Sequence, residues 1–130
     1  ECYAEQLNQV FMNILSNAIA ALEEVSAQRI SQEIRETVDK ITIQTSMIDL
    51  KWIKISISDN GLGISDAIKQ KIFDPFFTTK PVGKGTGMGM SISYKIITEK
   101  HRGKLECCSS PGEGTSFIIQ IPVRQTVPAL

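Results

Sequence analysis

Alternating isoleucines limit the possible folds of this chain more than any other feature. The alternating positions are Ile41, Ile43 and Thr45 in one run, Ile53, Ile55 and Ile57 in the next, and Phe117, Ile119 and Ile121 near the end. Successive side chains of a strand point to opposite faces, so each run predicts a strand with one apolar face. Such a sheet needs a second layer to cover that face.

The first part of the chain has the periodicity of an amphipathic helix. Apolar residues recur over residues 4–24 at steps of three and four, namely Leu7, Phe11, Ile14, Ala18 and Leu22. Residues 23–40 are polar and charged and contain neither Pro nor Gly. They are compatible with a continued helix or with a connection between elements.

Two further helices are expected. Ser65 can cap a helix that starts at Asp66. Another helix is predicted from about Met88 to His101, with Gly103 just past its end. Between them, residues 74–89 contain two prolines and four glycines and predict a long loop.

These elements predict an α+β fold. We expect a two-layer sandwich in which about three helices cover one face of a mixed, mostly antiparallel sheet. The last two strands, 104–109 and 115–123, are joined by the turn SPGEG. We expect a single domain over residues 1–130 with a loose tail at 123–130. Because the chain starts at ECYAEQL without a Met, it is expected to be a fragment of a longer protein.

Composition excludes several classes of protein. The 14 basic and 14 acidic residues balance, which gives no general attraction to nucleic acid or acidic membranes. Cys2, Cys107 and Cys108 lack the spacing of a disulfide framework, and a reducing compartment suits them. The single histidine, His101, has no metal-site spacing and is expected to favour the dipole at a helix end.

The motif DNGLGI directly follows the second predicted strand. A turn explains its glycines and amide. Asp59, however, could accept a hydrogen bond from an exocyclic amine such as that of adenine, and Gly61 and Gly63 would let a flat ring approach. Thr115 could share this site from a neighbouring strand, or it could be an ordinary β-branched strand residue.

A second glycine-rich motif, GKGTGMGMS, lies immediately before a predicted helix. Glycines and free N–H groups at a helix start suit phosphate, although a flexible linker would look similar. The motif is not a P-loop, because Lys84 is followed by Gly85. It is not a dinucleotide fingerprint either, because Met90 stands where a glycine is required.

Asn13 and Asn17 lie one turn apart on the first helix, beside its apolar stripe. Asparagine is a poor residue for a helix interior. The pair could belong to a solvated face, or it could offer amide oxygens to Mg²⁺.

These motifs occur in an order that resembles the ATP-binding catalytic domain of sensor histidine protein kinases. That domain belongs to a superfamily shared with DNA gyrase, Hsp90 and MutL. The motifs that match its five boxes are NQVFMNILSNAIAAL, DNGLGI, IFDPFFTTK, GKGTGMGMSIS and GEGTSF, and the resemblance extends over residues 6–122. It implies that ATP and Mg²⁺ are the cofactors.

The resemblance also implies roles for individual residues. Asn17 would be the Mg²⁺ ligand, Asn13 and Lys80 would be catalytic, Asp59 would bind the adenine amino group, and Phe73 with Phe76 would anchor a mobile ATP lid. The implied ATP-binding residues are Asn13, Asn17, Asp59, Gly61, Gly63, Ile64, Phe73, Lys80, Lys84, Gly85, Thr86, Gly87, Met88, Gly89 and Thr115.

Several positions depart from the pattern of these kinases or of their gyrase and Hsp90 relatives. Ala20 stands where many such kinases have a lysine, and Arg102 stands where glycine is usual, so the turn there is expected to differ. Asn13 replaces the glutamate that serves the gyrase and Hsp90 relatives as general base. An amide cannot accept that proton at neutral pH, which favours phosphoryl transfer over hydrolysis.

The resemblance therefore implies a protein-histidine kinase domain that transfers the γ-phosphoryl group to a histidine on a dimerisation domain outside this chain. A response regulator would be an indirect partner, and neither nucleic acid nor membrane contact is expected. We expect a monomeric domain in the cytoplasm, whether or not the parent protein is anchored in a membrane. The alternatives are an ATP-gated switch like gyrase, a related serine kinase, or a degenerate docking module.

Overall fold

The computed structural model describes residues 2–32, 38–77 and 89–124, and the elements follow one another as the alternation of periodicities predicts. The elements are α1 (Ala4–Gln32), β1 (Ile41–Met47), β2 (Trp52–Asp59), α2 (Asp66–Lys69), α3 (Gly89–Lys95), the π-helical turn η1 (Ile96–Lys100), β3 (Lys104–Ser109) and β4 (Thr115–Pro122).

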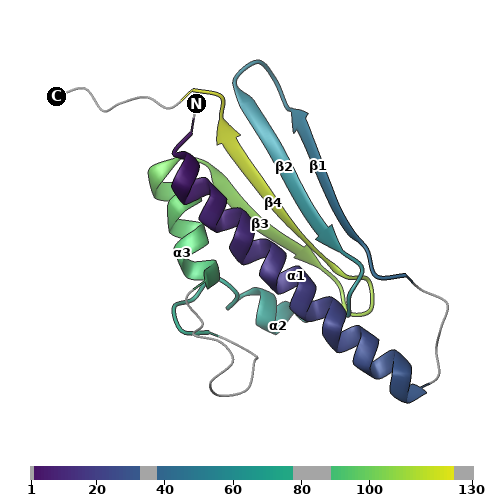
Figure 1. The fold of residues 1–130 in the computed structure, drawn as a ribbon. Helices are drawn as coiled ribbons and strands as arrows, with labels where there is room; N and C mark the ends of the chain where they lie inside the picture. Colours follow the sequence, from purple (N-terminus) through teal and green to yellow (C-terminus); the bar gives the residue numbers. More distant parts are fainter. Residues whose placement is uncertain (1, 33–37, 78–88, 125–130) are drawn as a thin grey trace.

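The four strands form one sheet in the order β1-β2-β4-β3. Helices α1 and α3 lie side by side on one face of this sheet, and α2 lies near its lower end (Figure 1). The predicted two-layer α+β sandwich is therefore confirmed. Every pair of neighbouring strands in the described part is antiparallel, so the parallel pairing of a mixed sheet does not occur there.

The core lies between the helix layer and the alternating residues of the sheet. Its buried members are Leu7, Val10, Ile14, Ile57, Met90, Ile96, Ile97, Leu105, Phe117, Ile119 and Ile121. On α1, Val10 is fully buried whereas the predicted Phe11 is only partly buried. The stripe is thus rotated slightly from the one read in the sequence.

The helix boundaries differ from those expected at two places. Helix α1 continues to Gln32, which resolves the open question about residues 23–32, since this polar stretch contains no Pro or Gly to end it. Helix α2 has only four residues, and its predicted cap is confirmed because the Ser65 hydroxyl accepts the N–H of Ile68 at 3.3 Å. The expected tail falls mostly on residues 125–130, which lie outside the described residues.

The turn after η1 keeps the left-handed conformation that glycine usually supplies. Arg102 has φ 56°, and the N–H of Gly103 reaches back to the carbonyl of Ile97 at 2.8 Å. The expected difference from the turn of the family stays a prediction. The close approach requires glycine one residue later, since a β-carbon on Gly103 would collide with the carbonyl oxygen of Gln120.

His101 is fully buried at the C-terminal end of η1. Its Nε2 accepts the backbone N–H of Tyr3 at 3.0 Å, so that nitrogen holds a lone pair. The proton is therefore on Nδ1, which lies 3.0 Å from the carbonyl of Ile96 and donates to it. Through these two contacts His101 joins the start of α1 to the end of η1. Its expected position at a helix end is confirmed, and its interaction with the helix dipole stays a prediction.

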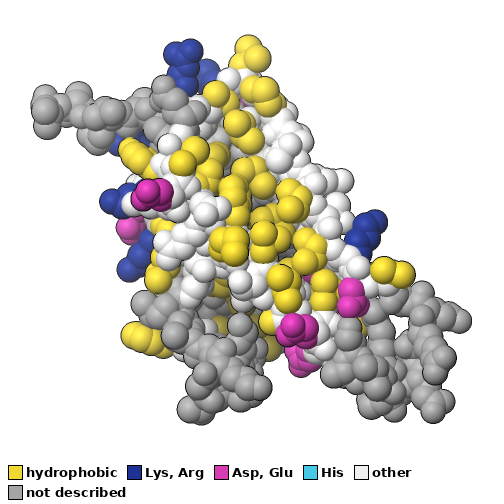
Figure 2. Space-filling model, in the orientation of Figure 1, with side chains coloured by type: hydrophobic (Ala, Val, Ile, Leu, Met, Phe, Trp, Pro, Cys, Tyr) yellow, Lys and Arg dark blue, Asp and Glu magenta, His cyan; other side chains and the backbone are white. Residues whose placement is uncertain are grey.

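Apolar residues gather on the face of the sheet next to α1, where Figure 2 shows them as a yellow surface. The edge strand β1 carries two exposed apolar side chains, Ile43 and Met47, which are 56% and 59% exposed. They pair with Ile57 and Ile53 of β2 and share their face of the sheet. Helix α1 crosses the opposite half of the sheet and leaves this strip uncovered (Figure 1).

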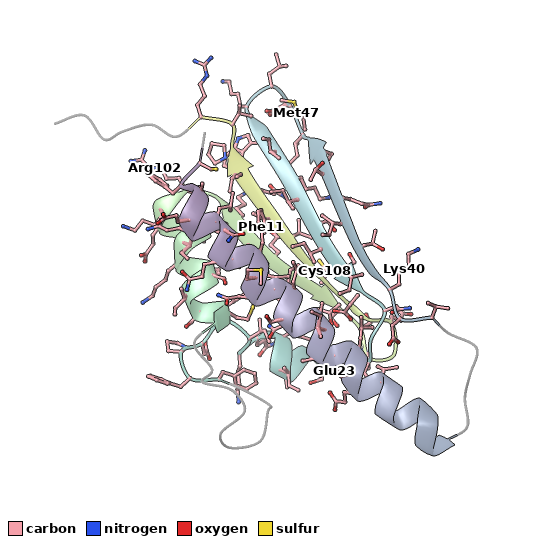
Figure 3. All side chains as sticks on the ribbon, viewed as in Figure 1. Phe11, Glu23, Lys40, Met47, Arg102 and Cys108 are labelled. Atoms are coloured by element: carbon pink, nitrogen blue, oxygen red, sulfur yellow. The ribbon has the colours of Figure 1, made fainter. Side chains whose placement is uncertain are left out.

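The cysteines behave as small apolar residues. Cys107 packs against the core and its pKa is raised by burial to about 11, while Cys108, labelled in Figure 3, is exposed. All three cysteines are free thiols. Among the described residues, no helix is both long and apolar enough to cross a membrane.

A matched pair of substitutions tests the left-handed turn. Arg102→Gly and Arg102→Ala remove the same side chain, but only alanine keeps the cost of a positive φ. We expect the glycine variant to be more stable than the alanine variant by about 1 kcal/mol in urea unfolding. Equal stability of the two variants would contradict the left-handed assignment.

Candidate functional site

Asp59 lies at the end of β2, directly opposite Thr115 at the start of β4. The antiparallel register brings these two predicted site residues together although 56 positions separate them. Asp59 is 9% exposed, and its Oδ1 accepts the N–H of Gly61 at 2.9 Å. The sequence therefore located this carboxylate correctly at a strand end.

Burial raises the pKa of Asp59 above its ordinary value. Backbone N–H groups of Gly61 and Thr115 act in the opposite direction and partly offset the burial. A carboxylate that is poorly solvated gains from any further donor. An exocyclic amine is such a donor, and the contact of Asp59 to adenine stays a prediction.

Two glycines near Asp59 accommodate the protein's own backbone. Gly63 and Gly114 have φ of 73° and 84°, a conformation that L-residues rarely adopt. A β-carbon on Gly63 would collide with the carbonyl oxygen of Ser110, and one on Gly114 with that of Asp59. These glycines let the loop after β2 dock on the turn between β3 and β4. The predicted role of Gly63 beside the base remains a prediction.

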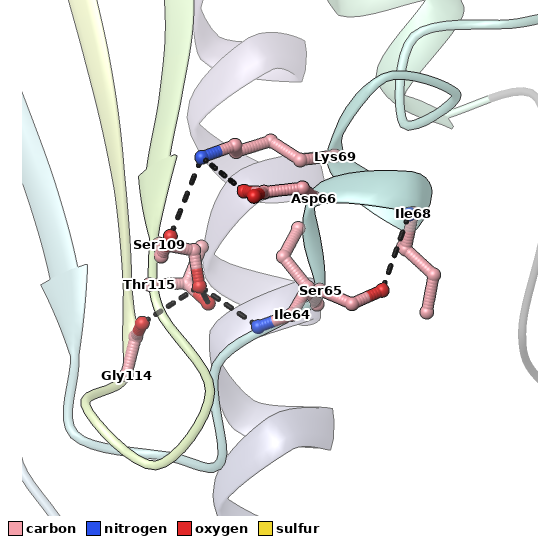
Figure 4. A network of polar contacts seen from close by, with 8 residues as sticks. All are labelled: Ile64, Ser65, Asp66, Ile68, Lys69, Ser109, Gly114 and Thr115. Carbon is pink, nitrogen blue, oxygen red and sulfur yellow. Dashed lines mark hydrogen bonds and ion pairs between the residues drawn. The ribbon is translucent and has the colours of Figure 1, made fainter.

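Ser109 holds this docked loop in place (Figure 4). Its hydroxyl donates to the carbonyl of Gly114 and accepts the N–H of Ile64, each at 2.8 Å. Because its one proton is used for Gly114, the contact with the Thr115 hydroxyl at 3.0 Å is donated by Thr115. Ile64 thus contributes a structural N–H. Sequence reasoning did not identify Ser109, whose only signal was a hydroxyl at a strand end.

Asn13 joins α1 to the first turn of α3. Its Nδ2 donates to the carbonyl of Gly89 at 3.1 Å and to the hydroxyl of Ser93 at 3.0 Å. Asn17, one turn further along, is half-buried and makes no side-chain hydrogen bond to another described residue. Within residues 2–32, 38–77 and 89–124, no hydrogen bond occupies its amide oxygen. Ser93 was not singled out in the sequence.

The aromatic residues before the glycine-rich segment take different positions. The ring of Phe73 stacks on Tyr94 of α3 with centroids 5.0 Å apart, and meets Phe117 of β4 edge-on at 6.4 Å. Phe76 has φ 64° and is 74% exposed, so it is not anchored in the core. Of the two expected anchors, Phe73 alone packs against the folded domain.

Several predicted phosphate contacts cannot be placed. Lys80, Lys84, Gly85, Thr86, Gly87 and Met88 lie outside the described residues. Gly89, the last predicted glycine, is the first residue of α3 and touches the Asn13 amide.

One face of α1 connects the two parts of the site. Asn13, Asn17 and Ala21 follow one another at steps of four and therefore lie in a row. A β-carbon on Gly61 would lie 3.1 Å from Cβ of Ala21, so the Asp59 loop packs at one end of this row. Gly89 meets Asn13 at the other end, eight residues and roughly 12 Å along the axis.

This arrangement fits a divalent cation held partly by a ligand. No cluster of three or more His, Cys, Asp or Glu capable of holding a metal occurs among the described residues. Asn17 nevertheless offers a neutral oxygen, and Mg²⁺ commonly takes few protein ligands, several waters and substrate phosphates.

Comparisons with known proteins support a nucleotide site. Residues 2–125 match the family described as histidine kinase-, DNA gyrase B-, and HSP90-like ATPase. Sporulation kinase E of Bacillus subtilis is 38% identical over 95% of this chain and 15% of its own length. The histidine-protein kinase AtoS of Escherichia coli is 42% identical over 92% of this chain and 17% of its own length.

The fold has a solved counterpart of similar sequence. The nucleotide-free catalytic domain of the histidine kinase ThkA superposes with a TM-score of 0.70 and 35% identity, over 94% of this chain and 70% of that one. By contrast, the chain spans only about a sixth of the length of Sporulation kinase E and AtoS.

Alanine substitutions at two glycines distinguish a glycine that the backbone contacts require from one that they do not. Gly114→Ala is expected to destabilise the fold by at least about 1–2 kcal/mol, because its φ is positive and the Asp59 carbonyl blocks the methyl. Gly89→Ala places its methyl in ordinary contact, 3.6 Å from Cγ of Asn13, and should leave stability unchanged or slightly raised. Urea unfolding of both variants measures this, and equal losses would contradict it.

Proposed function

This chain belongs to the histidine kinase-, DNA gyrase B- and HSP90-like ATPase family as a catalytic ATP-binding domain of the sensor histidine kinase type, and from this premise we propose how it uses ATP. In our proposal, it binds Mg-ATP and transfers the γ-phosphoryl group to a histidine on a dimerisation domain outside this chain. That activity belongs to the whole kinase, of which relatives suggest this chain is a small part.

The row of Asn13, Asn17 and Ala21 is the observation that best supports the proposal. The loop of the Asp59 carboxylate packs at one end, and the start of α3 meets the other. A nucleotide lying along this row would place its base near Asp59 and its phosphates near Asn13. The free N–H groups at the start of a helix favour anionic oxygens there.

Four of the described residues have a role in this proposal. Asp59 accepts a hydrogen bond from the adenine amine, and Thr115 lies beside it in the register. Asn17 supplies an oxygen to Mg²⁺, and Asn13 orients toward the phosphates. A bound Mg²⁺ would neutralise phosphate charge. Lys80 and Lys84 remain candidates for the phosphates.

Phosphoryl transfer is favoured over hydrolysis by the chemistry of Asn13. Its amide nitrogen is engaged with Gly89 and Ser93, and an amide is not a base at neutral pH. The chain therefore lacks a general base for water at the position where the ATPase relatives are implied to have one. Catalysis would rest on positioning and charge stabilisation.

The remaining parts of the proposal concern the surroundings of the domain. We propose that residues 1–130 act as one monomeric domain in the cytoplasm. Its immediate partner would be the histidine-containing dimerisation domain of its parent, with a response regulator as an indirect partner.

Asp59→Asn tests recognition of the base. The variant replaces an acceptor with an amide that presents N–H groups to the adenine amine, so we expect ATP affinity to fall about 10- to 100-fold in calorimetry. Asp66→Asn is the matched control. The Asp66 side chain is 86% exposed and forms an ion pair with Lys69, so this variant should bind ATP normally. Unchanged affinity in Asp59→Asn would overturn the role of Asp59.

The type of chemistry is tested with a histidine-containing domain from a related kinase and labelled ATP. We expect an acid-labile phosphohistidine on that domain and hydrolysis near background without it. An acid-stable product would favour a serine kinase, and steady hydrolysis by the isolated chain would favour an ATP-gated switch.

A further inference from the structure

Ser93 lies one turn into α3, with no solvent exposure. Its hydroxyl donates to the carbonyl of Gly89, four residues earlier, at 2.8 Å. Such a bond within a helix is common and has no consequence for a ligand by itself. Here the same hydroxyl oxygen also receives a hydrogen bond from α1, through Nδ2 of Asn13 at 3.0 Å.

These contacts determine which side of the Asn13 amide faces α3. The carbonyl of Gly89 can only accept a hydrogen bond. The single proton of Ser93 points to Gly89, so toward Asn13 the hydroxyl also acts as an acceptor. Two acceptors face Asn13, and its NH₂ group alone can satisfy both.

The orientation of the Asn13 amide therefore follows from the two acceptors that face it, which only its NH₂ group can satisfy. A flipped amide would place Oδ1 against two acceptors and leave its N–H groups unpaired, which is unfavourable in a partly buried site. Oδ1 is held away from the Gly89 carbonyl, free of any hydrogen bond that the described residues provide.

We propose that Ser93 is a positioning residue that fixes the Asn13 amide so that Oδ1 stays directed toward the phosphates and their metal ion. The inference rests on the proposed function for the identity of that ligand, but not for the geometry. Ser93 acts through Asn13 and does not itself touch the nucleotide. Its effect is preorganisation, because the amide need not be reoriented when Mg-ATP binds.

Gly89 gives the arrangement a second consequence. Its carbonyl accepts from both Ser93 and Asn13, so the first residue of α3 is tied to α1. Loss of the Ser93 hydroxyl leaves Gly89 with one of these two side-chain donors and leaves one N–H of Asn13 without its acceptor.

The test compares Ser93→Ala with Ser93→Thr and Thr98→Ala. Threonine retains the hydroxyl and should restore the wild-type behaviour. Thr98→Ala removes a similar bond, from a hydroxyl to the carbonyl four residues earlier at 2.7 Å, but one that does not involve Asn13. It controls for a general loss of helix stability.

The first readout needs no nucleotide. In ¹⁵N-labelled apo protein, the side-chain NH₂ signals of Asn13 are assigned through their loss in Asn13→Ala. Ser93→Ala should shift these signals and speed their exchange with water, whereas Ser93→Thr and Thr98→Ala should leave them nearly unchanged. Identical Asn13 signals in wild type and Ser93→Ala would overturn the inference.

The second readout is the calorimetric affinity for ATP with Mg²⁺ and for adenosine alone. Ser93→Ala should weaken Mg-ATP binding about three- to tenfold, the effect of one net hydrogen bond, and leave adenosine binding unchanged. Equal loss for both ligands, or no loss for Mg-ATP, would overturn the positioning role. If the wild type bound neither ligand, the proposed function would fail while the apo signals would still report on Ser93.

Discussion

The packing of α1 on the sheet determines where both parts of the candidate site lie. Its buried stripe, with Val10 and Ile14 fully excluded from solvent, fixes the rotation of the helix about its axis. Once that rotation is set, the neighbouring row of Asn13, Asn17 and Ala21 meets the Asp59 loop at one end and the start of α3 at the other. Apolar burial, which is non-directional, thus places polar groups that need accurate directions.

Much of the fold could be predicted because it depends on local periodicity. Alternation identified the strands, including the run that ends at Asp59, and Ser65 was recognised as a cap from its own chemistry. The end of α1 could not be predicted, because residues 23–32 contain nothing that stops a helix and nothing that requires one. The π-helical turn at Ile96–Lys100, whose Ile96 and Ile97 are buried, was equally hidden, because no residue in it marks a departure from an ordinary helix.

The candidate site was predictable where one residue has a recognisable chemistry, and less so where contacts between distant segments define its role. Asp59 and Asn13 could be named from their residue type and position. The roles of Ser93 and Ser109 depend on partners on other elements, and serine is too common to stand out. Gly63 shows the converse, because a glycine that suggested space for a ligand also accommodates the backbone of Ser110.

The buried His101 has a mechanical consequence. Its bond to the N–H of Tyr3 connects the start of α1 to the end of η1, and Asn13 connects α1 to the start of α3 ten residues later. Two cross-connections roughly 15 Å apart prevent either helix from sliding or rolling on the other without breaking one of them. The two helices are therefore held together at two points along α1. A displacement of the start of α1 relative to α3 and η1 therefore breaks either the Tyr3–His101 or the Asn13–Gly89 hydrogen bond.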